Sequence, residues 1–147
     1  MRLADPVTDA LVIYDGARDF ISRMDHPECI ATGDALIEAL SFIITLPGFE
    51  CWLDERDGKT VGGIGLLFSP PLWNRRIMGM TEIFIWASQD APKMTFLRLL
   101  KTAARRKTEM GVTHTELVKL TSSPPGLDKI YSAMGLKKVQ ETWIGVG

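Results

Sequence analysis

The sequence has 147 residues, of which 46% are hydrophobic and 24% charged, with a net charge of -1 and a pI near 6.1. These values indicate one globular domain over residues 1–147, and they argue against a surface shaped as a whole for nucleic acid. The two cysteines, Cys29 and Cys51, lack zinc-site spacing and are expected to be reduced thiols. Acidic residues near the N-terminus interrupt any signal-like or membrane-spanning run, so we expect a cytoplasmic protein without membrane contact.

Two helices are expected in the N-terminal third. From Thr8 to Met24 apolar residues recur at helical spacing, although Gly16 weakens the pattern. The second helix is expected to be capped by Thr32 or Asp34 and to end before Pro47. Its apolar face consists of Leu36, Ile37, Leu40, Ile43 and Ile44.

Three antiparallel strands are expected next. Phe49 to Asp54 and Thr60 to Phe68 are strand-like and flank the dipeptide Asp57-Gly58, which is typical of a β-hairpin turn. The dipeptide Pro70-Pro71 ends the second of these strands, and Ile77 to Ala87 predicts a third, longer one.

The C-terminal half alternates helices and strands. A helix is expected from about Thr95 to Gly111, with an apolar stripe opposite basic residues. Val112 to Leu120 predicts a strand parallel to the preceding one, because a helix connects the two. Leu127 to Met134 predicts a short helix, and Leu136 to Val146 a last strand. The expected fold class is therefore α/β, with a mixed, mostly antiparallel sheet and helices on both faces.

This order of elements resembles the GNAT superfamily of acetyl-CoA-dependent N-acyltransferases over most of the chain. The C-terminal piece IYSAMGLKKV is similar to the family's YxxxGF segment, with Tyr131, Gly135 and Leu136 in the three places. The stretch MTEIFIWASQDAPKMTFLRLLK resembles the family's central strand and cofactor helix, and RLADPVTD resembles the first strand and turn of many members.

The resemblance implies that acetyl-CoA binds at the start of the helix that begins near Thr95, where free N–H groups and the helix dipole favour an anion. The family signature Q/RxxGxG/A matches Gln89, but Pro92 and Met94 replace the small residues, and proline has no N–H to donate. Amides after Pro92 and the charge of Lys93 are the alternatives for holding a phosphate. The alternative interpretation is that Pro92 merely occupies the first position of the helix and that Lys93 is solvated.

The resemblance also implies catalytic roles for two residues. Glu82 is similar to the glutamate that histone-acetylating members use as a general base, and a carboxylate in a dry cleft would have a raised pKa. The alternative is an exposed strand glutamate. Tyr131 lies where the family places the acid that protonates the departing thiolate, and its alternative is a core aromatic.

Further cofactor contacts follow from the same resemblance. Backbone amides around Trp86 and Ala87 would supply the oxyanion and pantetheine contacts. Ser122 and Ser123 stand near positions where the family often has asparagine, and they are candidate hydrogen-bond donors. Trp73 lies in a loop beside two arginines, a pattern that indicates an acceptor site or a protein interface.

Two functions remain open from the sequence. One is an N-acyltransferase that moves an acetyl group from acetyl-CoA to a small-molecule amine or a protein lysine. The other is a non-catalytic, phage-type GNAT-fold protein that acts in binding or assembly. For either function a homodimer or a protein assembly is open, since edge strands near either end of the sheet could pair between subunits. A nucleic-acid role for the basic stripe (Arg98, Lys101, Arg105, Arg106 and Lys107) is disfavoured by the acidic pI.

Overall fold

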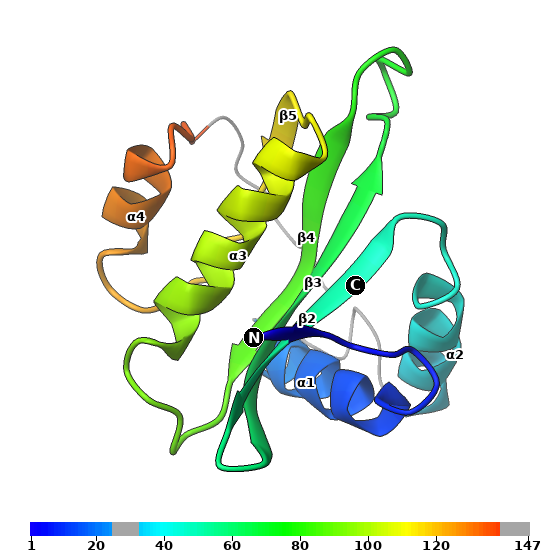
Figure 1. Ribbon diagram of the computed structural model, residues 1–147, viewed down its shortest axis with the longest axis vertical. Coiled ribbons are helices and arrows are strands. Elements are labelled where there is room, and N and C mark those ends of the chain that lie inside the picture. The colour runs from blue at the N-terminus through cyan, green and yellow to red at the C-terminus, as the bar shows by residue number, and fades with distance from the viewer. Residues whose placement is uncertain (25–32, 139–147) are drawn as a thin grey trace, which may run out of the picture.

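The computed structural model describes residues 1–24 and 33–138. Its centre is a five-stranded sheet in the order β1-β2-β3-β4-β5, with β1 at Arg2–Leu3, β2 at Phe49–Arg56 and β3 at Lys59–Ser69. The sheet is completed by β4 at Gly79–Ala87 and β5 at His114–Glu116 (Figure 1). The first three pairings are antiparallel and β4 pairs β5 in parallel, which confirms the expected mixed sheet.

Helices cover both faces of this sheet. The helix α1, Ala10–Ser22, lies against β3 and β4 on one face and contacts α2, Asp34–Ile43. On the other face α3, Thr95–Glu109, packs against β2, β3 and β4, with α4, Leu127–Ala133, beside it (Figure 1). The buried core includes side chains from α1, α2, α3 and all three long strands.

The hairpin between β2 and β3 forms where the sequence predicts it. Asp57 and Gly58 both have positive φ, 49° and 75°, as the turn requires. The helix α3 ends as expected before Gly111, whose φ of 63° is the left-handed conformation that closes a helix.

Several expected boundaries were wrong. The second helix has Gly33 as its N-cap without a side-chain cap, and Asp34 is its first residue. The third strand begins at Gly79 rather than Ile77, and the strand expected over Val112 to Leu120 is only His114–Glu116. The expected last strand lies mostly in residues 139–147, outside the described residues, as do Thr32 and Cys29.

Gly16 has a packing role that the sequence pattern did not reveal. A Cβ added there would lie 1.9 Å from Trp86 Nε1, so the indole of β4 rests directly on the backbone of α1. The helix is unbroken at this residue. A glycine that weakens the helix locally therefore allows α1 to approach the central strand.

A β-bulge divides β4 into two halves. Leu66 of β3 opposes Glu82, whereas the preceding Gly65 opposes Phe84, so Ile83 is an extra residue in β4. An extra residue bends a strand and changes which side chains face each side of the sheet. This bulge sets the geometry of the candidate site.

Candidate functional site

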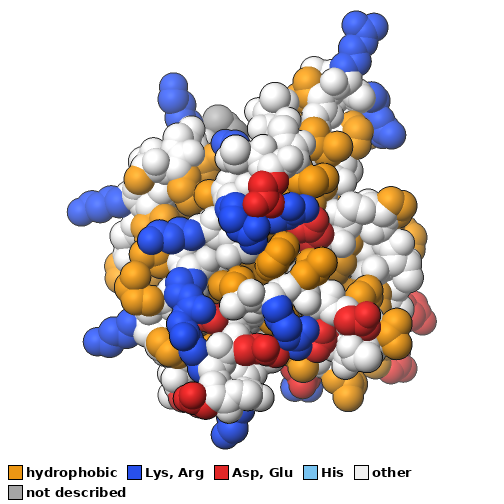
Figure 2. All heavy atoms as spheres, in the orientation of Figure 1, with side chains coloured by type: hydrophobic (Ala, Val, Ile, Leu, Met, Phe, Trp, Pro, Cys, Tyr) orange, Lys and Arg blue, Asp and Glu red, His pale blue; other side chains and the backbone are white. Residues whose placement is uncertain are grey.

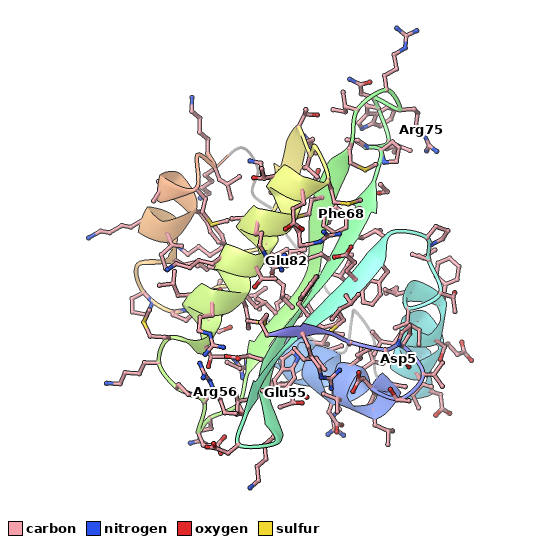
Figure 3. All side chains as sticks on the ribbon, in the orientation of Figure 1. Asp5, Glu55, Arg56, Phe68, Arg75 and Glu82 are labelled. Atoms are coloured by element: carbon pink, nitrogen blue, oxygen red, sulfur yellow. The ribbon has the colours of Figure 1, made fainter. Side chains whose placement is uncertain are left out.

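The carboxylate of Glu82 is the most unusual group in the sheet. Gly62 of β3 faces α3, because a Cβ built there would lie 2.7 Å from Thr95 Cγ2. Leu66, four residues along β3, lies on the same face, and so does its partner Glu82. Glu82 is only 2% exposed, which excludes the alternative of an exposed strand glutamate (Figure 3 labels it beneath α3).

Burial without a partner changes the protonation of Glu82. Neither carboxylate oxygen makes a hydrogen bond to the described part of the chain that meets ordinary geometric limits. Loss of solvation raises the pKa of Glu82 from 4.5 to about 8, and the nearby backbone N–H of Val118 offsets only part of that shift. The side chain is thus neutral in most molecules at neutral pH.

The strands diverge where Glu82 stands. β4 and β5 pair only from Gly79 with His114 to Thr81 with Glu116. Beyond Thr81, β4 continues to Ala87 without a strand partner on that side among the described residues. Glu82 is therefore the first residue of the divergence.

The divergence leaves backbone groups of β4 available for other partners. Ser88 N–H donates to Val61 O at 2.9 Å, and an antiparallel ladder alternates, so Trp86 also turns its N–H toward β3. Ala87 and Ile85 turn theirs toward the opening. The carbonyl of Ala87 accepts a hydrogen bond from Arg23 Nη2 at 3.2 Å.

Tyr131 belongs to the same cluster as Glu82. Its hydroxyl donates to the carbonyl of Val118 at 2.8 Å, on the residue whose N–H lies near the Glu82 carboxylate. Burial, followed by the charge of Glu82, raises the pKa of Tyr131. The two candidate catalytic side chains therefore lie on either side of Val118, and the Tyr131 hydroxyl is bonded to the backbone.

The start of α3 supplies fewer amides than a glycine-rich loop would. Thr95 N–H already donates to Pro92 O at 2.8 Å, and Pro92 has no N–H. The N–H groups of Phe96 and Leu97 have no acceptor in the described segments. Those two amides and the helix dipole still suit an anion.

The side chains around this helix start differ in exposure. Gln89, Lys93 and Met94 are exposed beside it. The Thr95 hydroxyl is buried, in a residue only 1% exposed, and has no hydrogen-bond partner within residues 1–24 and 33–138. The Thr95 hydroxyl is thus a polar group whose partner the described chain does not supply.

The two candidate serines are already bonded within the protein. Ser122 Oγ donates to Arg23 O at 2.8 Å, and Ser123 Oγ accepts from Leu120 N–H at 2.8 Å. Arg23 is also paired with Asp19 at 2.5 Å. It therefore links the end of α1, the end of β4 and the loop before α4, a long-range arrangement that no sequence pattern indicated.

A groove of about 340 Å³ lies between α3 and α4. Its lining is mostly apolar, with Lys101 and Lys129 at its margin. Figure 2 shows Lys and Arg side chains gathered over these two helices. The residues that line it are Leu97, Leu100, Lys101, Ala104, Lys129, Ile130, Ala133 and Met134. An apolar groove with cationic margins suits a ligand that combines flat apolar and phosphate groups.

Most arginines of the basic stripe on α3 are already paired. Arg98 binds the buried Asp54 at 2.6 Å, and Arg106 binds Glu50 of β2. Arg105 pairs with Glu109 at 2.9 Å. Three of the five basic side chains of the stripe are therefore engaged in ion pairs within the protein.

The described ranges contain neither a metal-binding cluster nor a membrane-spanning helix. No group of three or more His, Cys, Asp or Glu residues there could hold a metal ion. Likewise, no described helix is both long and apolar enough to cross a bilayer. Cys51 is buried and free, and burial raises the pKa of its thiol to about 12.

Comparison with solved structures identifies the fold. A transcriptional regulator from Bacillus halodurans matches with a TM-score of 0.72 and 16% identity, over 99% of this chain and 97% of that one. A ribosomal-protein-alanine N-acetyltransferase from Brucella melitensis matches with a TM-score of 0.67 and 13% identity over the whole of both chains. A predicted acetyltransferase from Clostridium acetobutylicum, solved with acetyl-CoA, gives 0.68 and 15%, over 99% of this chain and 94% of that one.

The chain has the fold of the GNAT acetyltransferases, as the sequence resemblance implied. No protein-family model and no curated protein sequence matches it. The comparisons give no support to the expected phage-type relationship. At these identities the likeness shows the fold alone.

Proposed function

We propose that this protein is an acetyl-CoA-dependent N-acetyltransferase with an amine acceptor. The observation that carries the proposal is Glu82, a buried carboxyl without a partner at the point where β4 and β5 separate. Structural proteins rarely bury such a group, whereas active sites use burial to bring a carboxyl pKa near the working pH.

Glu82 would serve as the general base. A group with a pKa of about 8 is a carboxylate in roughly half of the molecules at pH 8, and it can then accept a proton from an ammonium group. The backbone N–H groups of Ile85 and Ala87, which turn away from β3, would stabilise negative charge that develops on a carbonyl oxygen in the opening. Tyr131 would return a proton to the leaving group once its bond to Val118 O is released.

The residues present also fit acetyl-CoA, which when bound supplies an activated acetyl thioester. The free amides of Phe96 and Leu97, together with Lys93, would hold the diphosphate. The orphaned Thr95 hydroxyl lies at the same helix start. Lys101 and Lys129 would attract the remaining phosphate toward the groove between α3 and α4.

The acceptor is proposed only as a class, either a small-molecule amine or an amine of a protein. The Brucella neighbour is named for acetylation of the alanine of a ribosomal protein, which is a property of that protein. Either class requires a base that works on a protonated amine. The proposed role of Glu82 is the same for both.

Binding is the first test. Titration calorimetry with acetyl-CoA should give a dissociation constant in the micromolar range, and Pro92→Gly should tighten it because glycine restores an N–H and permits close approach. Lys93→Ala should weaken binding several-fold, while Lys59→Ala, which changes an exposed lysine at the start of β3, should leave it unchanged. No heat and no thermal shift at millimolar acetyl-CoA would exclude the proposal.

Turnover is the second test, with a panel of amines and peptides. Glu82→Gln should lower kcat by about 10²–10⁴-fold, the usual contribution of a general base. In the wild type kcat/KM should rise with pH and level off near the pKa of Glu82. Tyr131→Phe should lower kcat more than it changes KM. Full activity in both variants would rule out these roles even if acetyl-CoA binds.

One alternative has an observation of its own. Arg23 already occupies the carbonyl of Ala87, and Pro92 removes an amide from the helix start. Both features would also suit a GNAT-fold protein that binds a partner and has lost catalysis. Absence of acetyl-CoA binding in the calorimetric test is the outcome that favours it.

A further inference from the structure

The loop between β3 and β4 forms a projecting knob, which we define as residues 70–77. Figures 1 and 2 show it extending beyond the rest of the sheet, and Figure 3 labels Arg75 at its end. Trp73 is 93% exposed and Leu72 is 72% exposed. The knob thus places two large apolar side chains next to each other in one projecting loop, and tryptophan is enriched among the residues that carry binding energy at protein interfaces.

The knob is ordered and positively charged. Asn74 N–H donates to Pro71 O at 3.1 Å, and Asn74 Oδ1 accepts from Arg76 N–H at 3.2 Å. The guanidinium groups of Arg75 and Arg76 have no ion pair with any described residue. The knob therefore presents two apolar side chains and two unpaired positive charges.

A matching surface lies on α2 of the same molecule. Asp34, Glu38 and Phe42 are spaced i, i+4, i+8 and form one stripe, with Ile37 beside it; we call these four residues the α2 stripe. Phe42 is 64% exposed and Ile37 is 49% exposed. Neither acidic residue has an ion pair within the described chain. This stripe thus carries two apolar side chains and two unpaired negative charges.

The charges of the whole chain follow the same division. Residues 1–56 contain eleven acidic and four basic side chains, whereas residues 57–147 contain seven acidic and thirteen basic ones. The α2 stripe belongs to the negative segment and the knob to the positive one. The unpaired charges of the knob and of the α2 stripe in two copies would therefore attract each other.

We propose that two copies of this chain form a dimer in which the knob of each seats on the α2 stripe of the other. Trp73 and Leu72 would pack on Phe42 and Ile37, and the arginines would pair with the two acids. In Figure 1 the knob projects at the top and α2 lies at the lower right, so the two surfaces are separate, and a two-fold dimer would form the same contact twice. A closed dimer then uses every member of both surfaces.

Other occupants fit the charges less well. A nucleic acid would meet only two free arginines on the knob, in a chain whose net charge is -1, so phosphate contacts would be few. An unrelated acidic protein would match the knob but would leave the α2 stripe without a role. A second copy accounts for both surfaces together.

A charge-swap experiment tests the proposal by sedimentation velocity. The wild type should show a dimer whose dissociation constant rises with salt. The knob variant Arg75→Glu/Arg76→Glu and the stripe variant Asp34→Lys/Glu38→Lys should each sediment as monomers, because both contacts in their homodimers bring like charges together. An equimolar mixture of the two should form a heterodimer, because one contact is then charge-reversed and the other is wild type.

The controls separate charge from folding. Lys59→Glu/Lys137→Glu makes the same change in net charge as the knob variant, away from both surfaces, and should remain dimeric. Trp73→Ser should weaken the dimer at least tenfold, with an unchanged melting temperature, because the side chain packs on nothing in one copy. A monomeric wild type overturns the proposal, as does a dimer indifferent to the knob variant, or a mixture that stays monomeric. Binding of the knob to an oligonucleotide or another acidic protein by a monomer would also overturn it.

Discussion

Replacing Glu82 with glutamine should change the way in which stability depends on pH. The folded-state pKa of this carboxyl is about 8, above its ordinary value of 4.5, because burial disfavours the charged form. A raised folded-state pKa means that the folded protein binds a proton that the unfolded chain releases. The stability associated with neutral Glu82 is therefore fully present below pH 4.5 and is lost as pH rises toward 8.

The magnitude follows from the size of the shift. Each unit of pKa difference corresponds to about 1.4 kcal/mol, so the free energy of unfolding should fall by about 4 kcal/mol between pH 5 and pH 9 on account of this group. Total stability of a domain is roughly 5–15 kcal/mol, so the loss is a large part of it. Glutamine has a similar shape and no charge, and Glu82→Gln should remove this dependence.

Urea denaturation at intervals from pH 5 to pH 9 measures the effect. The variant should match the wild type near pH 5 and exceed it by about 4 kcal/mol at pH 9, with the same slope against urea. Asp90→Asn, which removes an exposed carboxylate in the loop after β4, is the matched control and should run parallel to the wild type. If the Glu82→Gln curve is also parallel, the carboxyl is solvated in the folded state and the reasoning is refuted.

Two further predictions concern packing and ion pairs. Arg98→Met leaves the fully buried Asp54 with Arg56, 4.0 Å away, as its remaining ion-pair partner among the described residues. The free energy of unfolding, measured in urea, should fall by about 3–5 kcal/mol. A loss below about 1 kcal/mol would show that water reaches the carboxylate. Gly16→Ala places a Cβ against the Trp86 indole and should destabilise the protein by about 1–3 kcal/mol, with a changed tryptophan emission; an unchanged melting temperature would mean that α1 moves freely.

Local sequence signals predicted much of the fold. The turn at Asp57-Gly58 requires positive φ at both residues, and few other dipeptides accept it, so the hairpin was readable from two residues. The helix α3 has a strong apolar stripe and a glycine at its end, and its position was confirmed to within a residue or two. These features depend on neighbours in the sequence.

The candidate site depends on contacts that are remote in the sequence. Whether Glu82 faces water or the core is decided by the α3 packing and by the bulge at Ile83, and a period-2 pattern cannot show either. The bond from Arg23 to Ala87 O spans 64 residues. No local pattern encodes it. The exposure of Trp73, in contrast, was foreseen from its loop, since prolines and a polar turn surround it.

The extra residue Ile83 is required for the opening beside Glu82 but not for the packing of the fold. Side chains before and after it already lie on the faces that a regular strand would give them once Ile83 is left out of the count. Deleting Ile83 should therefore produce a protein with an intact core and a straight central strand, along which β5 can remain hydrogen-bonded further. The presence or absence of this one residue would then decide whether the sheet has an opening beside Glu82.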